Sequence, residues 1–587
     1  MMQPLGIFFN ERSAVPRRGG RLAQALGFAA ILLVLGSGLA LRAQAVRFPP
    51  VSGGDAALFH DALAKECTAP PRQLPVTGIS VPHHLLAADL IARGVCAASG
   101  NSYERIVVMG PDHFRRSRRP LATTRRGFDT VLGPVEVDQA AVDVLIQRQD
   151  LADDSDLFMG EHGITAILPL LRAVFPDVPI VPVALGIGTD RQEWDMAVDL
   201  LKQIVTPRTL VVQSTDYSHY LLPHIARSRD QETLNVIATN DPAAIAGLRQ
   251  SNHLDSKASQ YVQIRLQQDV FHSHAAVVAN RNSFEYGHEY VPSTSYIVTV
   301  YAADETALSR LAYTDQQVTY FGGDVFLGRL LTVPLLDKAA VDVVVDGVGH
   351  ITNRQPLVIN LEGVITPDPP LNVPRNRHLM DDRLAGPVLQ AIHVVAAGLA
   401  NNHSFDLGPD GMAASVRTLK ARGIRPLPHA AVVDLGAFRL VALNFVGSGD
   451  AKGYPVVRRI DPRGRRLAKT DVTRLCTSPA LPPLVALVHW GSEYTSSAGA
   501  GERMIAEELA ACGVSLVIGA HSHQASTDLE RVRGGEALML YSMGNLLFDQ
   551  VSSRGSGTVV ELRVFKQGTF ATRVVPAPNF YEAVVKN

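Results

Sequence analysis

Residues 318–329 read VTYFGGDVFLGR, an apolar run that stops at a glycine pair and Asp324. Later apolar runs stop in the same way, at polar residues within the motifs VINLEG, LANNHSFD, ALVHWGSEY, VIGAHSH and LYSMGN. Short apolar runs bounded by polar turns are typical of buried strands. Open α/β sheets carry their ligand sites at the carboxyl ends of such strands. The pattern therefore predicts an α/β domain with one site built from strand ends.

The polar residues at these strand ends are oxygen and nitrogen donors: Asp324, Asn360, Glu362, Asn402, His403, His489, His521, His523 and Asn545. Such donors favour Mn²⁺, Fe²⁺ or Zn²⁺ over thiol-seeking metals. A pair of these ions can activate a water and hold a phosphoryl or acyl oxygen. Each residue alone also fits a simpler interpretation, such as a turn at Asp324, a helix cap at Asn402 or a core histidine at His489. The closely spaced His521 and His523 favour a metal.

Six motifs carry a resemblance to a known family: GGDVFLGR, NLEGVIT, ANNHSFDLG, HWGSEY, GAHSHQ and YSMGNLLFDQ. In this order, over Val318–Gln550, they resemble the CapA family of poly-γ-glutamate capsule biosynthesis, which is similar to calcineurin-like metallophosphoesterases. The resemblance implies a β-sandwich flanked by helices. It implies one metal held by Asp324, Glu362 and His523, and a second held by Glu362, Asn402, His489 and His521. It further implies His403 as the acid facing the leaving group and Arg329 beside an anionic group. Asn545, at the end of the last apolar run, is expected to contact the substrate.

One position departs from the wider phosphoesterase pattern, which places a histidine two residues after the first aspartate. Here that residue is Phe326, which cannot bind a metal, and the second-motif aspartate is Glu362. The first metal would then have fewer protein ligands, and the bond acted on could be an amide of an anionic polymer. A polymer-binding fold with a vestigial site is the alternative.

The first half of the chain shows a similar alternation of apolar strands and helices. Strands are expected at 105–109, 180–184, 210–213 and 293–301, and a helix at 164–174. Polar clusters again follow the apolar runs and contribute His83, His84, His113, Glu161, His162, Asp216 and His219. Two histidines with one carboxylate are a ligand set of non-haem iron. A structural histidine or a capped turn explains each cluster taken alone.

The motifs VPHH, GPDH, EHG and STDYSHY resemble the Memo family, called AmmeMemoRadiSam system protein B in bacteria, over Thr77–Tyr301. That family is similar in fold to class III extradiol dioxygenases, but a fold does not carry an activity with it. Where the family has a Cys-Gly, this chain reads HLDSKAS, and Asp255 is the nearest substitute. We therefore expect His83, His113 and Asp255 to bind iron or another divalent metal, with Asp216 and His219 in support.

Six arginines crowd the segment that follows His113, namely Arg115, Arg116, Arg118, Arg119, Arg125 and Arg126. Guanidinium groups bind carboxylates and phosphates through paired hydrogen bonds. Arg115 and Arg116 in particular are expected to contact an anionic substrate. The alternative is a solvated loop, or a loop that faces anionic lipid.

The N-terminal residues predict where in the cell the protein is located. Residues 1–21 carry four arginines against one acid, and residues 22–41 contain no charge. Such a segment can cross a bilayer with its basic end inside, and Ala43-Gln44-Ala45 fits a cleavage site. Residues 22–45 are thus a transmembrane anchor or a cleaved signal peptide. Either alternative places the bulk of the chain in the periplasm or outside the cell.

Composition sets further limits on the chain of 587 residues. With 46% hydrophobic and 19% charged residues, it is globular rather than disordered. A net charge of −1 excludes a strongly basic, general nucleic-acid binder, and 4 cysteines exclude a disulfide scaffold. The organisation we expect is a basic N-terminus (1–21), the hydrophobic segment (22–45), a tether (46–75), a Memo-like α/β domain (76–302), a linker (303–317) and a CapA-like domain (318–587).

Together these features predict an envelope protein that performs metal-dependent hydrolysis or group transfer on an anionic cell-surface polymer. Poly-γ-glutamate is the first choice of polymer, and the capsule-synthesis machinery is the expected partner. Two other classes stay open. One is a non-catalytic binding or scaffold protein, and the other is a metal-dependent oxidoreductase centred on the Memo-like domain.

Overall fold

The computed structural model describes residues 47–50, 55–68, 74–287, 293–370, 373–447, 482–550 and 556–586. The anchor or signal expected at 22–45 lies outside these residues. Among the helices that are described, none is both long enough and apolar enough to cross a membrane.

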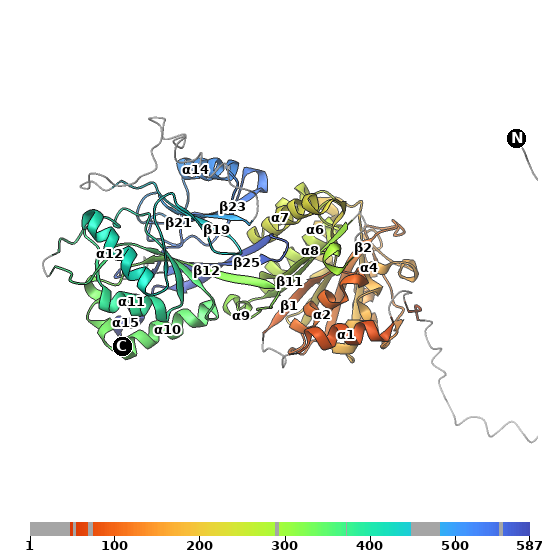
Figure 1. The fold of residues 1–587 in the computed structure, drawn as a ribbon. Helices are drawn as coiled ribbons and strands as arrows, with labels where there is room; N and C mark the ends of the chain where they lie inside the picture. Colours follow the sequence, from red (N-terminus) through yellow and green to blue (C-terminus); the bar gives the residue numbers. More distant parts are fainter. Residues whose placement is uncertain are drawn as a thin grey trace, which may run out of the picture. The chain divides into compact units, whose positions relative to one another are not determined.

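The first half of the chain is built around a nine-stranded sheet (Figure 1). The strand order is β10 (His274–Asn282), β11 (Ser293–Ala302), β1 (Val76–Val81), β8 (Thr209–Ser214), β2 (Arg105–Asp112), β7 (Ile180–Gly186), β3 (Leu121–Thr123) and β6 (Ala152–Asp154), with β9 (Tyr217–Leu221) paired to β11. The strands β1, β8, β2 and β7 are parallel to one another. Because parallel strands end at the same edge, the residues that follow β1, β2 and β8 meet there.

Helices cover both faces of these parallel strands, which explains why the strands are apolar throughout. One face packs against α2 (Ala88–Ala97) and α5 (Leu168–Val174), and the other against α6 (Arg191–Leu201) and α8 (Lys257–Leu266). The four strands expected here are confirmed as β2, β7, β8 and β11. The helix expected at 164–174 is instead two helices, α4 (His162–Thr165) and α5. Pro169 lies in the first turn of α5, where its missing N–H is tolerated.

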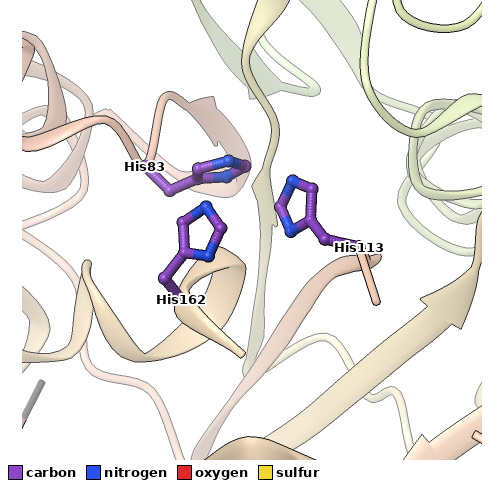
Figure 2. Close-up of side chains that lie close together, drawn as sticks. All are labelled: His83, His113 and His162. Atoms are coloured by element: carbon purple, nitrogen blue, oxygen red, sulfur yellow. The ribbon is translucent and has the colours of Figure 1, made fainter. Parts of the chain in front are cut away.

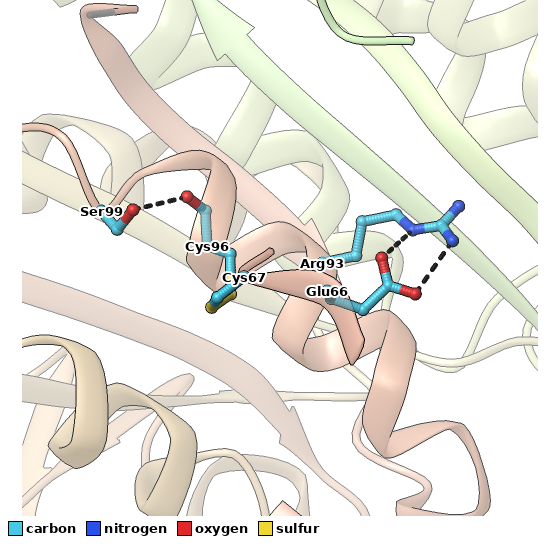
Figure 3. The surroundings of a disulfide bond; sticks show 5 residues. All are labelled: Glu66, Cys67, Arg93, Cys96 and Ser99. Atoms are coloured by element: carbon cyan, nitrogen blue, oxygen red, sulfur yellow. Dashed lines mark hydrogen bonds and ion pairs between the residues drawn. A yellow bond between two sulfur atoms is a disulfide. The ribbon is translucent and has the colours of Figure 1, made fainter. Parts of the chain in front are cut away.

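The segment expected as a tether contains a packed helix, α1 (Ala56–Glu66), whose N-cap Asp55 accepts from the Leu58 N–H. Phe59 and Ala62 are buried on one side of it. A disulfide between Cys67 and Cys96 ties its end to α2, and Arg93 of α2 pairs with Glu66 at 2.9 and 3.1 Å (Figure 3). The proline and glycine content of 46–75 predicts an irregular segment and gives no sign of this helix.

The second half of the chain contains two larger sheets (Figure 1). The seven-stranded sheet has the order β17 (Arg425–Leu427), β16 (Val394–Gly398), β13 (Leu357–Leu361), β12 (Gln316–Val325), β25 (Ser556–Phe565) and β26 (Phe570–Pro578), with β24 (Asn545–Leu547) paired to β12. The six-stranded sheet has the order β18 (Val432–Asp434), β19 (Arg439–Asn444), β20 (Leu484–His489), β21 (Val514–Ala520), β23 (Ala537–Leu540) and β22 (Glu530–Val532). In both sheets the central strands are parallel.

An apolar layer joins the inner faces of the two sheets, with Phe321 and Val358 on one side and Leu487 and Ile518 on the other. The outer face of the seven-stranded sheet packs against α10 (Lys338–Thr352), α11 (Asp382–Ala391) and α15 (Phe580–Lys586). The outer face of the six-stranded sheet packs against α14 (Ala500–Ala511). This mixed α/β arrangement agrees with the helix-flanked sandwich that the motif series implied.

The expected linker at 303–317 is also structured. It contains α9 (Glu305–Leu308) and the first residues of β12. Arg563 and Arg573 pair with the buried Glu561 and donate to the carbonyl groups of Leu311 and Glu305. Buried charged groups therefore hold the segment in place, a feature that its polar composition does not reveal.

Candidate metal centres

The strand-end residues of the second half converge on Glu362, which directly follows β13. Three groups of donor atoms share this carboxylate: Asp324–Glu362–His523, Glu362–His489–His521 and Glu362–His378–His403. Within each group the donor atoms lie within 4.8 Å of one another. We call these seven residues the Glu362 cluster. All except His403 are buried. The structure thus brings together the predicted ligands of both metal positions.

Glycines let the motifs of the cluster approach one another. A Cβ atom on Gly323 would lie 1.9 Å from the carbonyl oxygen of Gly544, to which the Asp324 N–H donates at 2.9 Å. The Asp324 Oδ2 atom in turn accepts from the His521 N–H at 3.1 Å. His521 and His523 have φ angles of 90° and 55°. Left-handed backbone at non-glycine residues costs free energy and clusters at functional sites, so the loop holds both imidazoles in a strained, defined position.

Amide side chains orient several donors of the cluster. Asn360 donates to Asp324 Oδ1 at 2.7 Å. The Asn402 Oδ1 atom lies 2.6 Å from His489 Nε2, so these two predicted ligands occupy neighbouring positions.

Other polar atoms of the cluster have no partner. Glu362 Oε2 and His521 Nδ1 are buried, and neither has a hydrogen-bond partner among the described residues. Leaving such atoms unpaired costs roughly 1–3 kcal/mol each. A divalent cation would satisfy both atoms, so the donor set fits a metal.

The pKa values of two histidines in the cluster, His489 and His521, agree with metal binding. Burial and the Asp324 carboxylate raise the pKa of Glu362 well above its ordinary value. Burial lowers the pKa of His489 well below its usual range, and burial together with His523 lowers the pKa of His521 to about 4. Both imidazoles are therefore neutral near pH 7, the state in which histidine binds metals. Burial opposes the charge of His523, but Glu362 and Asp324 outweigh it and raise its pKa to about 10.

His403 has the geometry of a proton carrier. Its Nδ1 atom lies 2.9 Å from Asp406 Oδ2, and its side chain is 17% exposed. A carboxylate on Nδ1 fixes the ring and leaves Nε2 to exchange a proton. The acid role that the resemblance implied for His403 stays a prediction.

His378 is a member of the cluster that the motifs did not single out. Its ring stacks on His403 at 3.6 Å between centroids and on Phe326 at 4.6 Å. Its Nδ1 atom lies 3.2 Å from the Glu362 carbonyl oxygen, which only accepts, so Nε2 keeps a lone pair. An imidazole from a separate segment thus lies against Phe326, where the wider pattern has a histidine. A lone histidine in RNRHLMD gives no sequence signal of this.

The structure gives two other predicted residues different partners. Asn545 is fully buried, and its Oδ1 atom lies 2.9 Å from His523 Nδ1. It is placed to orient that imidazole, and its contact with a substrate stays a prediction. Arg329 forms a two-point ion pair with Asp549 and donates to the Arg375 carbonyl at 2.9 Å. Its charge is therefore already balanced by Asp549.

A second cluster lies at the strand ends of the first half. The rings of His83, His113 and His162 face one another, with donor nitrogens within 4.8 Å (Figure 2). Asp255 Oδ2 lies 3.2 Å from His83 Nε2 and 3.5 Å from His113 Nε2. The other oxygen of Asp255 is buried without a hydrogen-bond partner among the described residues. His83, His113 and Asp255 therefore lie together as predicted, and His162 joins them.

Two carboxylates support this three-histidine cluster. Glu161 accepts from the backbone N–H of His113 at 2.9 Å and lies 2.7 Å from its Nδ1 atom. Although burial opposes it, Asp255 and Glu161 raise the pKa of His113 to about 10. Such a carboxylate behind a histidine fixes its tautomer and strengthens it as a ligand. Asp216 accepts from the His83 N–H at 3.0 Å, which agrees with its expected supporting role.

Other residues predicted for this site are not members of the three-histidine group. His219 Nδ1 lies 3.2 Å from Thr294 Oγ1, and this residue is not a member of the three-histidine group. Among the arginines, Arg125 pairs with Asp143 and Asp154, and Arg126 pairs with Asp156. Arg115, Arg116, Arg118 and Arg119 are exposed. Arg115 and Arg116 thus remain open to solvent beside the cluster.

The fold and the two clusters define a mixed α/β protein with two separate groups of side chains that could hold a metal. Residues 64–299 match the family described as Memo-like protein. Residues 318–430 and 447–550 match the family described as bacterial capsule synthesis protein PGA_cap. The two halves of the chain therefore resemble these two families in that order, and both resemblances are confirmed. We call residues 64–299 the Memo-like region.

Individual relatives match the Memo-like region in part. A MEMO1 family protein of Thermotoga sp. (strain RQ2) is 31% identical over 140 residues, which is 23% of this chain and 50% of that protein. One from Methanobrevibacter smithii is 29% identical over 169 residues, 28% of this chain and 60% of that protein. The chain spans about half the length of the curated relatives it matches. A hypothetical protein from Thermus thermophilus aligns over all of its length and 45% of this chain, with 16% identity and a TM-score of 0.28, too low to support an argument.

Proposed function

We propose that the second half of this chain performs metal-dependent hydrolysis or group transfer on an anionic cell-surface polymer, with poly-γ-glutamate the first candidate. The observation that carries the proposal is the sharing of Glu362 by three donor groups. A carboxylate in this position suits a pair of divalent ions such as Mn²⁺, Fe²⁺ or Zn²⁺. When bound, such ions polarise the bond to be cleaved and lower the pKa of a water.

Different residues of the chain would supply the donor atoms, the proton and the contacts with the polymer. Asp324 and Glu362 supply negative charge, and the neutral His489 and His521 complete the donor set. His403, oriented by Asp406, holds a proton at Nε2 and passes it to the leaving group. The exposed Arg115 and Arg116 suit carboxylates of a polymer bound near the three-histidine cluster.

An extracytoplasmic location is part of the proposal. The Cys67–Cys96 disulfide supports it, and Cys512 is disulfide-bonded as well. Disulfides of this kind persist in oxidising compartments and are rare in the cytosol. The hydrophobic segment at 22–45 then acts as the anchor or the signal.

Metal analysis followed by a substrate screen tests this function. The full chain is loaded with Mn²⁺, Fe²⁺ or Zn²⁺, its bound metal is counted, and it is offered phosphoesters and γ-glutamyl peptides. We expect Asp324→Ala and His523→Ala to lose metal and turnover, and His403→Ala to keep metal but lose turnover by about 100-fold or more. His393→Ala, an exposed histidine on a turn, is the matched control.

If metal-loaded protein cleaves neither substrate class and His403→Ala behaves like wild type in the cell, the hydrolase proposal fails. Absence of bound metal would favour the alternative, a non-catalytic polymer-binding or scaffold protein.

The three-histidine cluster favours a second candidate function, a metal-dependent oxidoreductase centred on the Memo-like region. His83, His113, His162 and Asp255 offer nitrogen and carboxylate donors, which suit Fe²⁺ or another divalent metal better than a thiol-seeking one. Oxygen uptake by the iron-loaded chain, lost in His113→Ala, would support this function. Without such uptake, the cluster is an accessory binding site.

A further inference from the structure

An apolar stripe lies on the surface next to the Glu362 cluster. It is formed by Leu330, Val333 and Leu336, whose exposed fractions are 60%, 74% and 74%. Leu331 and Leu335, between them in sequence, are buried. The segment therefore presents leucine and valine side chains to the core and to solvent at once, although solvent-facing positions normally carry polar residues.

The local backbone places the three exposed side chains on one side. Residues 329–331 and 334–336 form two 3-10 turns, η6 and η7, and Thr332 and Val333 between them keep helical dihedral angles. Side chains three residues apart align in a 3-10 helix. A spacing of three residues from Leu330 to Val333 to Leu336 thus gives one continuous stripe.

Positive charge borders this stripe. The Arg329 side chain donates to the Arg375 carbonyl at 2.9 Å, so the loop that carries the exposed Arg375 and Arg377 lies beside it. Arg329 and Lys338 have acidic partners, Asp549 and Asp342. Within the described part of the chain, no ion pair involves Arg375 or Arg377.

We propose that Leu330, Val333 and Leu336, together with Arg375 and Arg377, form a docking face for a lipid bilayer with anionic headgroups. Small apolar groups enter the boundary between headgroups and acyl chains, and basic residues next to them pair with anionic lipid. Unpaired positive charge beside the stripe favours such a surface over a neutral partner.

Docking would orient the metal site. The Arg329 guanidinium lies 4.8 Å above the Phe326 ring, and Phe326 stacks on His378 of the Glu362 cluster. The docking face and the His378 side of the cluster are therefore linked by direct contacts. This proposal rests on the proposed function only for the location at the envelope, and it adds that the site works at the lipid surface.

A tryptophan reporter tests the docking face in the full chain. The sequence has 2 tryptophans, Trp194 and Trp490, and both are buried, so lipid-borne quenchers have little native signal to reach. Leu336→Trp is reconstituted in phosphatidylcholine vesicles with and without phosphatidylglycerol, using brominated acyl chains as quenchers. We expect the added fluorescence to fall by about half in anionic vesicles. Val432→Trp, an exposed strand position outside this face, should stay unquenched.

Charge reversal and a second reporter complete the test. In the Leu336→Trp protein, the added changes Arg375→Glu and Arg377→Glu should weaken binding to anionic vesicles. The lipid concentration that gives half-maximal quenching should rise about tenfold or more. Leu330→Trp should repeat the result if Leu336→Trp folds poorly. Equal quenching of Leu336→Trp and Val432→Trp, or a lipid-independent dimer that shields the reporter, would overturn the proposal. Metal content is measured on the same samples, so a failure of the metal site is distinguished from a failure of docking.

Discussion

Replacing Glu362 with glutamine should change the stability of the protein in opposite directions with and without metal. Glutamine keeps the shape of the side chain but removes its charge. In the metal-free protein the Glu362 carboxyl is buried beside Asp324, and one of its oxygens has no hydrogen-bond partner among the described residues. Removing that charge should raise the free energy of unfolding by about 1 kcal/mol or more.

In the metal-loaded protein the same change should be costly. A ligand at a hundred times its Kd stabilises the folded state by about 2.7 kcal/mol. Loss of a charged donor shared by two metal positions should weaken binding by about 100-fold or more. At the same metal concentration, about 0.4 kcal/mol of stabilisation would then remain. For a domain of this size the thermal shift on adding Mn²⁺ should shrink from about 5–10 °C to about 1–2 °C.

Differential scanning calorimetry with and without Mn²⁺, together with metal counting, measures both effects. Glu561→Gln is the matched control, because Glu561 is equally buried but pairs with Arg563 and Arg573. Its loss should lower stability by about 3–5 kcal/mol and leave metal binding intact. The reasoning is refuted if Glu362→Gln keeps the wild-type metal shift, or if the metal-free variant is less stable than wild type.

Three further predictions follow from the same structure. The metal-free protein should lose stability as pH falls from 6.5 to about 4, by roughly 3 kcal/mol for His521, because the unfolded imidazole takes a proton in this range and the buried one does not. In urea denaturation at a series of pH values, His521→Gln should make the free energy of unfolding depend less on pH over this range, and an unchanged dependence would contradict the assignment. Asp255→Ala should remove metal from the three-histidine cluster, whereas Glu161→Gln should weaken binding there by about 10–100-fold by freeing His113; equal metal content in wild type and Asp255→Ala would argue against the site. Cys67→Ser with Cys96→Ser should lower the free energy of unfolding by about 3–4 kcal/mol, since the bridge closes a span of 29 residues; a variant as stable as wild type in urea would show that α1 is held by packing alone.

The residues at the strand ends could be predicted from the sequence for two physical reasons. Apolar runs such as 105–109 and 210–213 mark buried strands, and parallel pairing brings their ends to one edge. This is why Asp324, Glu362, His489, His521 and His523 lie together in the structure, and why His83 and His113 do too. The prediction needed no knowledge of the strand order, only that the strands run the same way.

The positions of residues outside the strand ends could not be predicted in this way. His378 lies between β13 and β16, in an excursion whose path no local pattern specifies, and tertiary packing alone places it on Phe326. Pro169 reads as part of one helical run at 164–174 but starts a new helix. The helix α1 was missed because 46–75 is rich in proline and glycine, although Asp55 is a good N-cap.

The two clusters differ in the groups that contact the Nδ1 atoms of their histidines, and this difference suits them to different chemistry. His113 has the carboxylate of Glu161 on its Nδ1 atom, which makes the ring a stronger electron donor to a bound ion. His523 has the neutral amide oxygen of Asn545 in the corresponding place. The same Nδ1 atom of His523 also lies 3.4 Å from Asp324 Oδ2, a ligand candidate itself, whereas His403, the residue placed to move a proton, pairs with Asp406 outside the donor set. The first arrangement suits tight binding of one ion, whereas the second places the carboxylate-paired His403 where it can move a proton.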